Sequence, residues 1–296
     1  MILIAGRYTK EAFYAAIGVT RQFLYKRKRR KEQIEEIVTP IVTLVQKKRE
    51  QFKKLGSRRL FYLLNIENIG INRFEKIVSE NNLTVKIKKK RIITTQGYYE
   101  EGDINLLNGK ELNDINQVIA GDITYLKTHK ITFYICALKD MYSKRIVGLY
   151  GSDNMLATTI IKALRQAIKL RGKGIHGCIH HSDAGSQYKS HIYKDLIKQH
   201  HIVPSIAENC LQNGMAEQLN GAIKNDYMLS NIRSVKELNK VLTHVKKTIN
   251  EQIPVANLGY MTPVQYEEYL KTVPLPNRKI IKLYDFNDKK GDFLQA

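Results

Sequence analysis

Three acidic residues between positions 122 and 217 lie where carboxylates could bind metal ions. Asp122 lies inside the apolar run QVIAGDITYL, Asp183 follows GIHGCIH in HHSDAGSQY, and Glu217 lies near the start of NGMAEQLNGAIK. Carboxylates that converge in a folded protein need a cation, because unpaired buried charges are costly. Oxygen ligands without a set of Cys or His ligands favour Mg²⁺ or Mn²⁺.

The chemistry open to such a site is phosphodiester displacement. Two divalent ions about 4 Å apart can activate a water or a DNA 3′-hydroxyl and stabilise the leaving oxygen. Each acid also has an ordinary interpretation by itself. Asp122 could be a strand-edge charge, Asp183 a turn former, and Glu217 an exposed residue in a first helical turn, where the helix dipole favours an acid.

The elements around the acids predict an α/β fold with a mixed sheet. Three β-rich runs are followed by an amphipathic helix, a fourth strand, a helix, a fifth strand and a further helix. These elements are expected at residues 117–126, 131–140, 144–151, 155–170, 174–180, 189–201, 202–206 and 213–229. Their order matches the ribonuclease-H-like fold. If the first and fourth strands are neighbours, Asp122 and Asp183 face each other, and Glu217 approaches from a covering helix.

The first hundred residues form a basic region. They carry 23 Lys or Arg against 9 Asp or Glu, in a chain whose formal net charge is +21. This balance makes a polyanion the expected partner, because each phosphate that a cation neutralises releases counterions. A generally basic protein with a solvated surface is the alternative.

Residues 9–30 predict a short helix, a turn at Gly18 and a second short helix capped by Thr20. This outline is typical of a helix-turn-helix and also of any helical hairpin. Six consecutive basic residues, 26–31, favour contact with DNA. The candidate DNA contacts here are Arg27, Arg29 and Arg30.

Residues 32–91 predict a second helix-turn-helix-like region for duplex binding. Its first helix is amphipathic, although Pro40 could kink or restart it. Ser57 and Asn72 are candidate N-caps of two further helices. The candidate DNA contacts here are Arg58, Arg59, Lys88, Lys89 and Lys90.

The chain is therefore expected to have five parts, which form an all-α DNA-binding front and an α/β core. They are a short basic helix-turn-helix (1–31), a second DNA-binding domain (32–91), a polar linker (92–115), the catalytic core (116–270) and a C-terminal tail (271–296). No signal peptide and no apolar run long enough to cross a membrane is found, so we expect a cytoplasmic protein without a membrane partner.

The cysteines argue against a structural zinc site. Cys136, Cys178 and Cys210 lie far apart and form no CxxC pair. A zinc site at Cys178, His180 and His181 is the rival interpretation of HHSDAGSQY, but no second pair of ligands follows it.

Three segments around the acids resemble the signatures of one enzyme family. QVIAGDITYL, HSDAGSQY and NGMAEQLNGAIKNDY resemble those of bacterial insertion-sequence transposases of the IS-three family, OrfB type. That family shares the Asp-Asp-Glu core of retroviral integrases. NLLNGKELNDINQV, LGYMTPVQYE and the stretch from GSRRLFYLL to KIKKKR resemble its flanking segments, so the resemblance covers residues 35–270.

The resemblance implies a role for each acid. Asp122, Asp183 and Glu217 would hold two Mg²⁺ or Mn²⁺ ions. Lys224, seven residues after Glu217, would contact the DNA of the element's end, and Asn213 and Asn220 would orient Glu217 or that DNA. A surface role is the alternative for these three residues.

The resemblance also implies the partners. They are double-stranded DNA, both as terminal inverted repeats and as target, and further copies of the chain assembled on that DNA. An upstream partner or fusion of the OrfA type, and association with the bacterial nucleoid, would accompany them. Tyr188, in the turn after Asp183, would line the site or pack beneath it.

The sequence departs from the family in places. Asp183 and Glu217 are separated by 33 residues, two fewer than is usual. Ile119 stands where a tryptophan is common, and Ile253-Pro254-Val255 replaces an Arg-Pro-His motif. The favoured hypothesis is a DNA transposase that cleaves at the 3′ end of its element and joins that end to DNA. A catalytically inactive or domesticated DNA-binding regulator, and a stand-alone nuclease of the same fold, are the alternatives.

Overall fold

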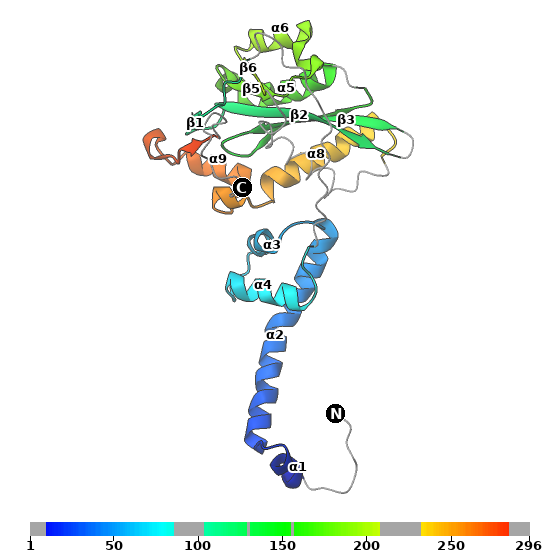
Figure 1. The fold of residues 1–296 in the computed structure, drawn as a ribbon, viewed down its shortest axis with the longest axis vertical. Coiled ribbons are helices and arrows are strands. Elements are labelled where there is room, and N and C mark those ends of the chain that lie inside the picture. Colours follow the sequence, from blue (N-terminus) through cyan, green and yellow to red (C-terminus); the bar gives the residue numbers. More distant parts are fainter. Residues whose placement is uncertain (1–9, 86–103, 129–130, 155–156, 208–231, 284–296) are drawn as a thin grey trace. The chain divides into compact units, whose positions relative to one another are not determined.

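The computed structural model describes residues 10–85, 104–128, 131–154, 157–207 and 232–283. Contacts divide the chain into two compact units, Met1–Lys86 and Ile87–Ala296. Figure 1 shows the first as a set of helices and the second as a sheet with helices. Within the described ranges, no helix is long and apolar enough to cross a membrane.

Four helices make up the described part of the first unit. They are α1 (Lys10–Ala16), α2 (Arg21–Gln51), α3 (Ser57–Leu64) and α4 (Ile71–Glu80). Gly18, with a φ of +67°, forms the turn between α1 and α2. The predicted cap at Thr20 is confirmed, because its Oγ1 accepts a hydrogen bond from the Phe23 N–H at 3.1 Å.

Helix α2 is much longer than the short helix that the sequence predicted. It continues through Pro40 for 31 residues, so the expected domain boundary after residue 31 falls inside one helix. No glycine interrupts residues 21–51, and ion pairs at i,i+4 spacing, such as Lys28 with Glu32 at 3.8 Å, support the helix.

The second half of α2 packs with α3 and α4 into a small core. The buried side chains are those of Ile41, Val45, Leu60, Phe74, Ile77 and Val78. The N-cap positions of α3 and α4 are Gly56 and Gly70, so the predicted caps Ser57 and Asn72 are wrong. Both predicted caps lie inside the first turn of their helix.

The second unit is built on a five-stranded mixed sheet. Its strands, in their side-by-side order, are β4 (Ile146–Ser152), β3 (Thr132–Asp140), β2 (Val118–Lys127), β5 (Ile179–Ser182) and β6 (Val203–Ile206). Strand β2 is antiparallel to β3 and parallel to β5. This order confirms the predicted ribonuclease-H-like sheet, in which the first and fourth strands of the five are neighbours.

Helices cover both faces of this sheet. They are α5 (Ala157–Arg171), α6 (His191–Gln199), α8 (Val235–Glu251) and α9 (Pro263–Leu270). In Figure 1, α5 and α6 lie on one side of the sheet, and α8 and α9 lie on the other. One apolar cluster joins α5 and α6 to Ile119, Cys136 and Leu138, and a second joins α8 to Phe133 and Ile135. Alternate residues of β3 therefore pack against opposite faces.

Two segments predicted to lie outside the core are packed in the second unit. Strand β1 (Glu111–Leu112), in the predicted linker, pairs antiparallel with β7 (Ile281–Lys282), in the predicted tail. Leu112 is fully buried and belongs to an apolar cluster with Leu270 of α9. The linker and tail predictions are therefore wrong for the described residues of these segments, because their apolar side chains fill the core under α9.

The fourth strand of the sheet is shorter than predicted. A 3₁₀ turn, η1 (Gly172–Ile175), precedes it, and Gly177 adopts a φ of +78°. Strand β5 therefore begins only at Ile179.

Side-chain amides bind the backbone of β4 along the open edge of the sheet. Each amide oxygen accepts from the N–H of one strand residue, and each amide nitrogen donates to the carbonyl of the same residue, at 2.7–3.2 Å. The three pairs are Asn250 with Ile146, Gln166 with Leu149, and Asn239 with Gly151. An open strand edge is a template for unwanted pairing. These amides take the place of a neighbouring strand and close that edge.

We expect Asn250→Leu to destabilise the second unit by about 1–3 kcal/mol. The substitution keeps the number and branching of the side-chain heavy atoms but leaves the buried N–H and C=O of Ile146 without partners. Thermal unfolding and hydrogen exchange at Ile146 would measure the effect. Gln252→Leu, at an exposed position two residues further along, is the matched control. Equal exchange at Ile146 in both variants would contradict this role of Asn250.

Candidate active site

The sheet aligns the first two predicted acids at the same level. Strands β2 and β5 pair in parallel, with Ala120 opposite His181. Two residues further along each chain, the same register brings Asp122 of β2 level with Asp183, the first residue after β5. Both carboxylates are half-buried. Asp122 Oδ1 accepts the Ile123 N–H at 2.8 Å, and Asp183 Oδ1 accepts the Gly185 N–H at 3.3 Å.

Electrostatic coupling places the two acids in one neighbourhood. Burial raises the pKa of the Cys136 thiol, and the charges of Asp122 and Asp183 raise it further. Burial likewise raises the pKa of Tyr188, with added contributions from Cys136, Asp183 and Asp122. Burial also raises the pKa of Asp183 itself, and the Gly185 N–H offsets only part of this effect. The charged form of Asp183 is therefore unfavourable in the folded protein, and a nearby cation would stabilise it.

The rings of His180, Tyr188 and Tyr193 pack together next to the turn that carries Asp183. His180 Nδ1 lies 2.7 Å from the Tyr193 hydroxyl, and the rings of Tyr188 and Tyr193 meet edge to face at 5.6 Å. Of the two expectations for Tyr188, the structure shows packing, because its side chain is buried against His180. Burial, together with a smaller contribution from the neighbouring His181, lowers the pKa of His180 to about 3, so His180 is neutral at physiological pH.

The other predicted site residues are distributed over both units. Arg27, Arg29 and Arg30 lie exposed on α2, and Arg59 lies exposed on α3. Arg58 forms an ion pair with Glu75 of α4 at 3.0 Å, so its guanidinium also joins two helices. The predicted residues that lie outside the described ranges are Glu217, Lys224, Asn213, Asn220, Lys88, Lys89 and Lys90.

The zinc interpretation of HHSDAGSQY finds no support in the geometry. His181 Nδ1 lies 2.9 Å from the Ser205 hydroxyl, and His180 contacts Tyr193. In the part of the chain that the structure describes, no three His, Cys, Asp or Glu side chains gather as metal ligands. The acid pair consequently lacks its third member among the described residues, and Glu217 is the residue proposed to supply it.

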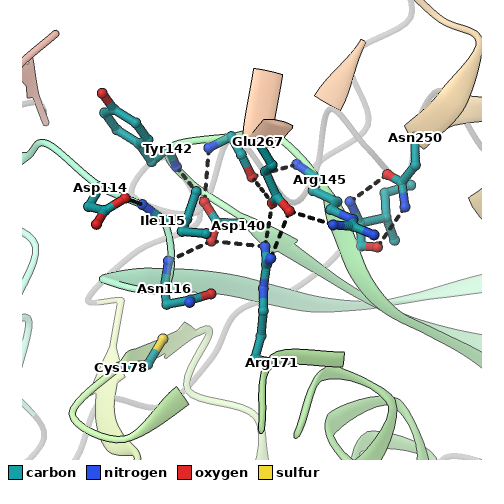
Figure 2. Close-up of polar contacts among 12 residues, drawn as sticks. Asp114, Ile115, Asn116, Asp140, Tyr142, Arg145, Arg171, Cys178, Asn250 and Glu267 are labelled. Carbon is teal, nitrogen blue, oxygen red and sulfur yellow. Dashed lines mark hydrogen bonds and ion pairs between the residues drawn. The ribbon is translucent and has the colours of Figure 1, made fainter. Parts of the chain in front are cut away.

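A buried ion cluster at the far end of β3 was missed by sequence reasoning. Glu267 of α9 accepts hydrogen bonds from Arg171 at 2.6 and 2.9 Å, from Ser143 at 2.7 Å and from Arg145. Arg171 also pairs with Asp140 at 3.4 Å. Figure 2 shows these side chains converging from β3, α5 and α9. The segment LGYMTPVQYE contains Glu267, but its partners lie about a hundred residues earlier, so no local pattern reveals the cluster.

Comparisons with known proteins identify several proteins to which this chain is similar. The integrase core domain family matches residues 113–209. The structure resembles the magnesium-bound catalytic core of HTLV-2 integrase, with a TM-score of 0.41 and 23% identity over 55% of this chain and 99% of that chain. The transposase InsF for insertion sequence IS3A of Escherichia coli (strain K12) is 33% identical over 111 residues, which are 37% of this chain and 38% of the relative.

A longer sequence match shows the family to which the chain belongs. The insertion element IS600 uncharacterized 31 kDa protein of Shigella sonnei is 30% identical over 223 residues, which are 72% of this chain and 81% of the relative. The match extends well beyond the integrase core domain. The chain therefore belongs to the bacterial insertion-sequence transposases, enzymes of the polynucleotidyl transferase type.

Proposed function

We propose that this transposase cleaves DNA at the 3′ end of its insertion sequence and joins the freed hydroxyl to target DNA. Asp122, Asp183 and Glu217 are the proposed catalytic acids. The observation that carries the proposal is the parallel pairing of β2 with β5, whose register brings Asp122 level with Asp183. An acid pair on neighbouring strands is suited to hold a divalent cation against a phosphate.

The donor set fits Mg²⁺ or Mn²⁺. Asp122 and Asp183 offer only carboxylate oxygens, which are the ligands that these hard cations prefer. The burial that raises the pKa of Asp183 also makes a bound cation favourable there. Asp122, Asp183 and Glu217 would hold two ions per site. When bound, the ions would polarise the phosphate and activate the attacking hydroxyl.

The protein's own residues then have distinct tasks. The two aspartates would position the cations beside the end of β5, and Glu217 would complete the ligand set. Lys224, Asn213 and Asn220 would contact the DNA of the element's end. The exposed arginines of α2 and Arg59 would bind duplex phosphates, together with Lys88, Lys89 and Lys90.

The chemistry also implies an assembly. Transposition requires two element ends to be held together, so we propose that the chain acts as an oligomer on terminal inverted repeats and target DNA. An upstream OrfA-type protein, separate or fused, is the proposed further partner.

A strand-joining assay tests this function. The purified full chain would be incubated with Mn²⁺ and a labelled duplex that carries the DNA end flanking its own gene. A labelled product longer than the substrate, absent when EDTA replaces Mn²⁺, is the expected result. The assay would be repeated with the product of the upstream reading frame added.

The other outcomes separate the alternatives. Duplex binding without a product, with the upstream protein present as well, would overturn the enzymatic proposal and identify a DNA-binding regulator. Shortened strands without any joined product would instead identify a nuclease.

We expect the basic run of α2 to contribute a salt-dependent part of DNA affinity. Replacing Arg27, Arg29 and Arg30 by Ala should lower the slope of log K against log salt by about 0.9 for each phosphate that is no longer neutralised. Fluorescence anisotropy of a labelled duplex over a salt series would measure this slope. Lys169→Ala, at an exposed position of α5, is the control. An unchanged slope in the triple variant would show that this run does not bind DNA.

A further inference from the structure

The residue before Asp122 must be a glycine, and the reason lies in the neighbouring strand. A Cβ added at Gly121 would lie 2.7 Å from His180 Nε2 and 2.7 Å from Leu138 Cδ2. Real Cβ atoms essentially never approach other atoms so closely. The φ of Gly121 is not in the positive range that favours glycine. The missing side chain therefore makes room for the imidazole of His180, which rests against the backbone of β2.

The His180 ring is fixed in that place from the other side. Its Nδ1 contacts the Tyr193 hydroxyl of α6 at 2.7 Å, and its ring centroid lies 5.8 Å from that of Tyr188 and 5.7 Å from that of Tyr193. His180 is 1% exposed. Its Nε2, on the side of Gly121, is buried and has no hydrogen-bond partner among the described residues.

These contacts connect the two acids mechanically. His180 lies three residues before Asp183, and Tyr188 lies five residues after it, in η2 (Ser186–Lys189). The rings of His180 and Tyr188, one on each side of the turn that carries Asp183, therefore pack against each other. The same imidazole rests on Gly121, whose chain neighbour is Asp122.

We propose that His180 is a positioning residue that sets the separation of the Asp122 and Asp183 carboxylates. Its ring packs against Gly121 and is held in place by the contact with the Tyr193 hydroxyl. This inference rests on the proposed function, because it takes the two acids as ligands of one metal site. The ring touches neither DNA nor metal in this role. It fixes the position of the end of β5 relative to the neighbouring strand β2, so that both carboxylates reach the same cation.

The test is the metal dependence of strand joining, measured on the full chain. Gly121→Ala forces the imidazole away from β2 and should raise the Mn²⁺ concentration for half-maximal joining about 10–100-fold, the range seen when residues supporting a metal ligand are removed. Tyr193→Phe removes only the hydroxyl contact and should raise it by a smaller factor. Melting temperatures would be recorded for each variant, so that loss of folding is recognised separately.

Two double variants show whether His180 or Leu138 causes the higher Mn²⁺ requirement of Gly121→Ala. Gly121→Ala combined with His180→Asn should recover part of the Mn²⁺ response, because the shorter Asn relieves the clash and still offers a polar atom to Tyr193, while the ring contacts of His180 are lost. Gly121→Ala combined with Leu138→Ala should not recover it. Recovery through Leu138 alone, or an unchanged Mn²⁺ requirement in both Gly121→Ala and Tyr193→Phe, would overturn the inference.

Failure of the proposed function gives a different pattern. In that case the wild-type chain itself shows no Mn²⁺-dependent joining. The rise in melting temperature with Mn²⁺ alone then serves as the readout, since a ligand that binds the folded state stabilises it. A Mn²⁺-induced rise that is equal in wild type, Gly121→Ala and Tyr193→Phe would overturn the positioning role.

Discussion

Asp183→Asn is expected to lower strand joining at least about a hundredfold without destabilising the fold. Loss of residues that merely support a metal ligand costs 10–100-fold, so loss of a ligand carboxylate should cost more. Stability should change in the opposite sense. Burial raises the pKa of Asp183, which means that its charge is unfavourable in the folded protein. A neutral Asn removes that charge, so the melting temperature in the absence of metal should stay equal or rise.

The joining assay and a thermal melt, run on the same preparation, check both halves of this prediction. Asp195→Asn replaces an exposed carboxylate on α6, twelve residues further along, and should leave joining unchanged. Joining by Asp183→Asn at the wild-type rate would remove Asp183 from the proposed site. A fall in joining together with a fall in melting temperature would indicate a structural role instead.

Glu267→Gln is expected to lower the free energy of unfolding of the second unit by about 3–5 kcal/mol, the cost of breaking a buried ion pair by removing one partner. Glu267 is 6% exposed and accepts hydrogen bonds from Arg171, Arg145 and Ser143. The neutral amide removes the carboxylate that Arg145 and Arg171 share, and it leaves Arg171 with Asp140 as its acidic partner. Glu268→Gln, at the adjacent exposed position, should change stability by less than about 0.5 kcal/mol.

The pH dependence of unfolding provides a second measure of the interaction between Glu267 and Arg171. Burial by itself would raise the pKa of Glu267, but the hydrogen bonds and charge of Arg171 outweigh it and lower that pKa from its ordinary value. A depressed pKa contributes stability that is present above the unfolded value and is lost as the pH falls through the folded value. Urea unfolding between pH 7 and pH 3 should therefore show a loss in the wild type that is smaller in Glu267→Gln. Parallel pH profiles for the two proteins would contradict the pairing.

The ion cluster also connects the end of the predicted core region to the rest of the second unit. Helix α9 begins at a capping box between Thr262 and Gln265, and Glu267 then connects α9 to Arg171 of α5 and to Ser143 and Arg145, which lie between β3 and β4. Arg278, beyond the helix, donates to the Leu270 carbonyl at 2.8 Å and pairs with Asp114. The last described residues are therefore connected to the segment that leads into β2.

Much of the core could be predicted from the sequence because its signals are local. β-rich runs of residues marked β2, β3 and β4, and apolar residues at helical spacing marked α5. Their order along the chain then predicted that β2 and β5 are neighbours, which the sheet confirms. Asp122 and Asp183 were identified by the same means, since each lies at a definable place in or after a strand. The roles of these acids remain predictions.

Tertiary structure decided the features whose partners are distant in sequence. Asp140, Arg171 and Glu267 each look like ordinary surface charges until the fold brings them together in a buried cluster. Gly121 looks like a flexible residue until His180, 59 positions later, occupies the place of its side chain.

The segments that sequence reasoning placed outside the core show the same principle. Leu112 lies in the predicted linker and Ile281 in the predicted tail, 169 positions apart, yet they pair as β1 and β7. Local patterns determine which elements form, because hydrogen bonding and side-chain alternation act over a few residues. Burial depends on the whole packing arrangement, so the positions of the linker, the tail and the buried charges became visible only in the folded molecule.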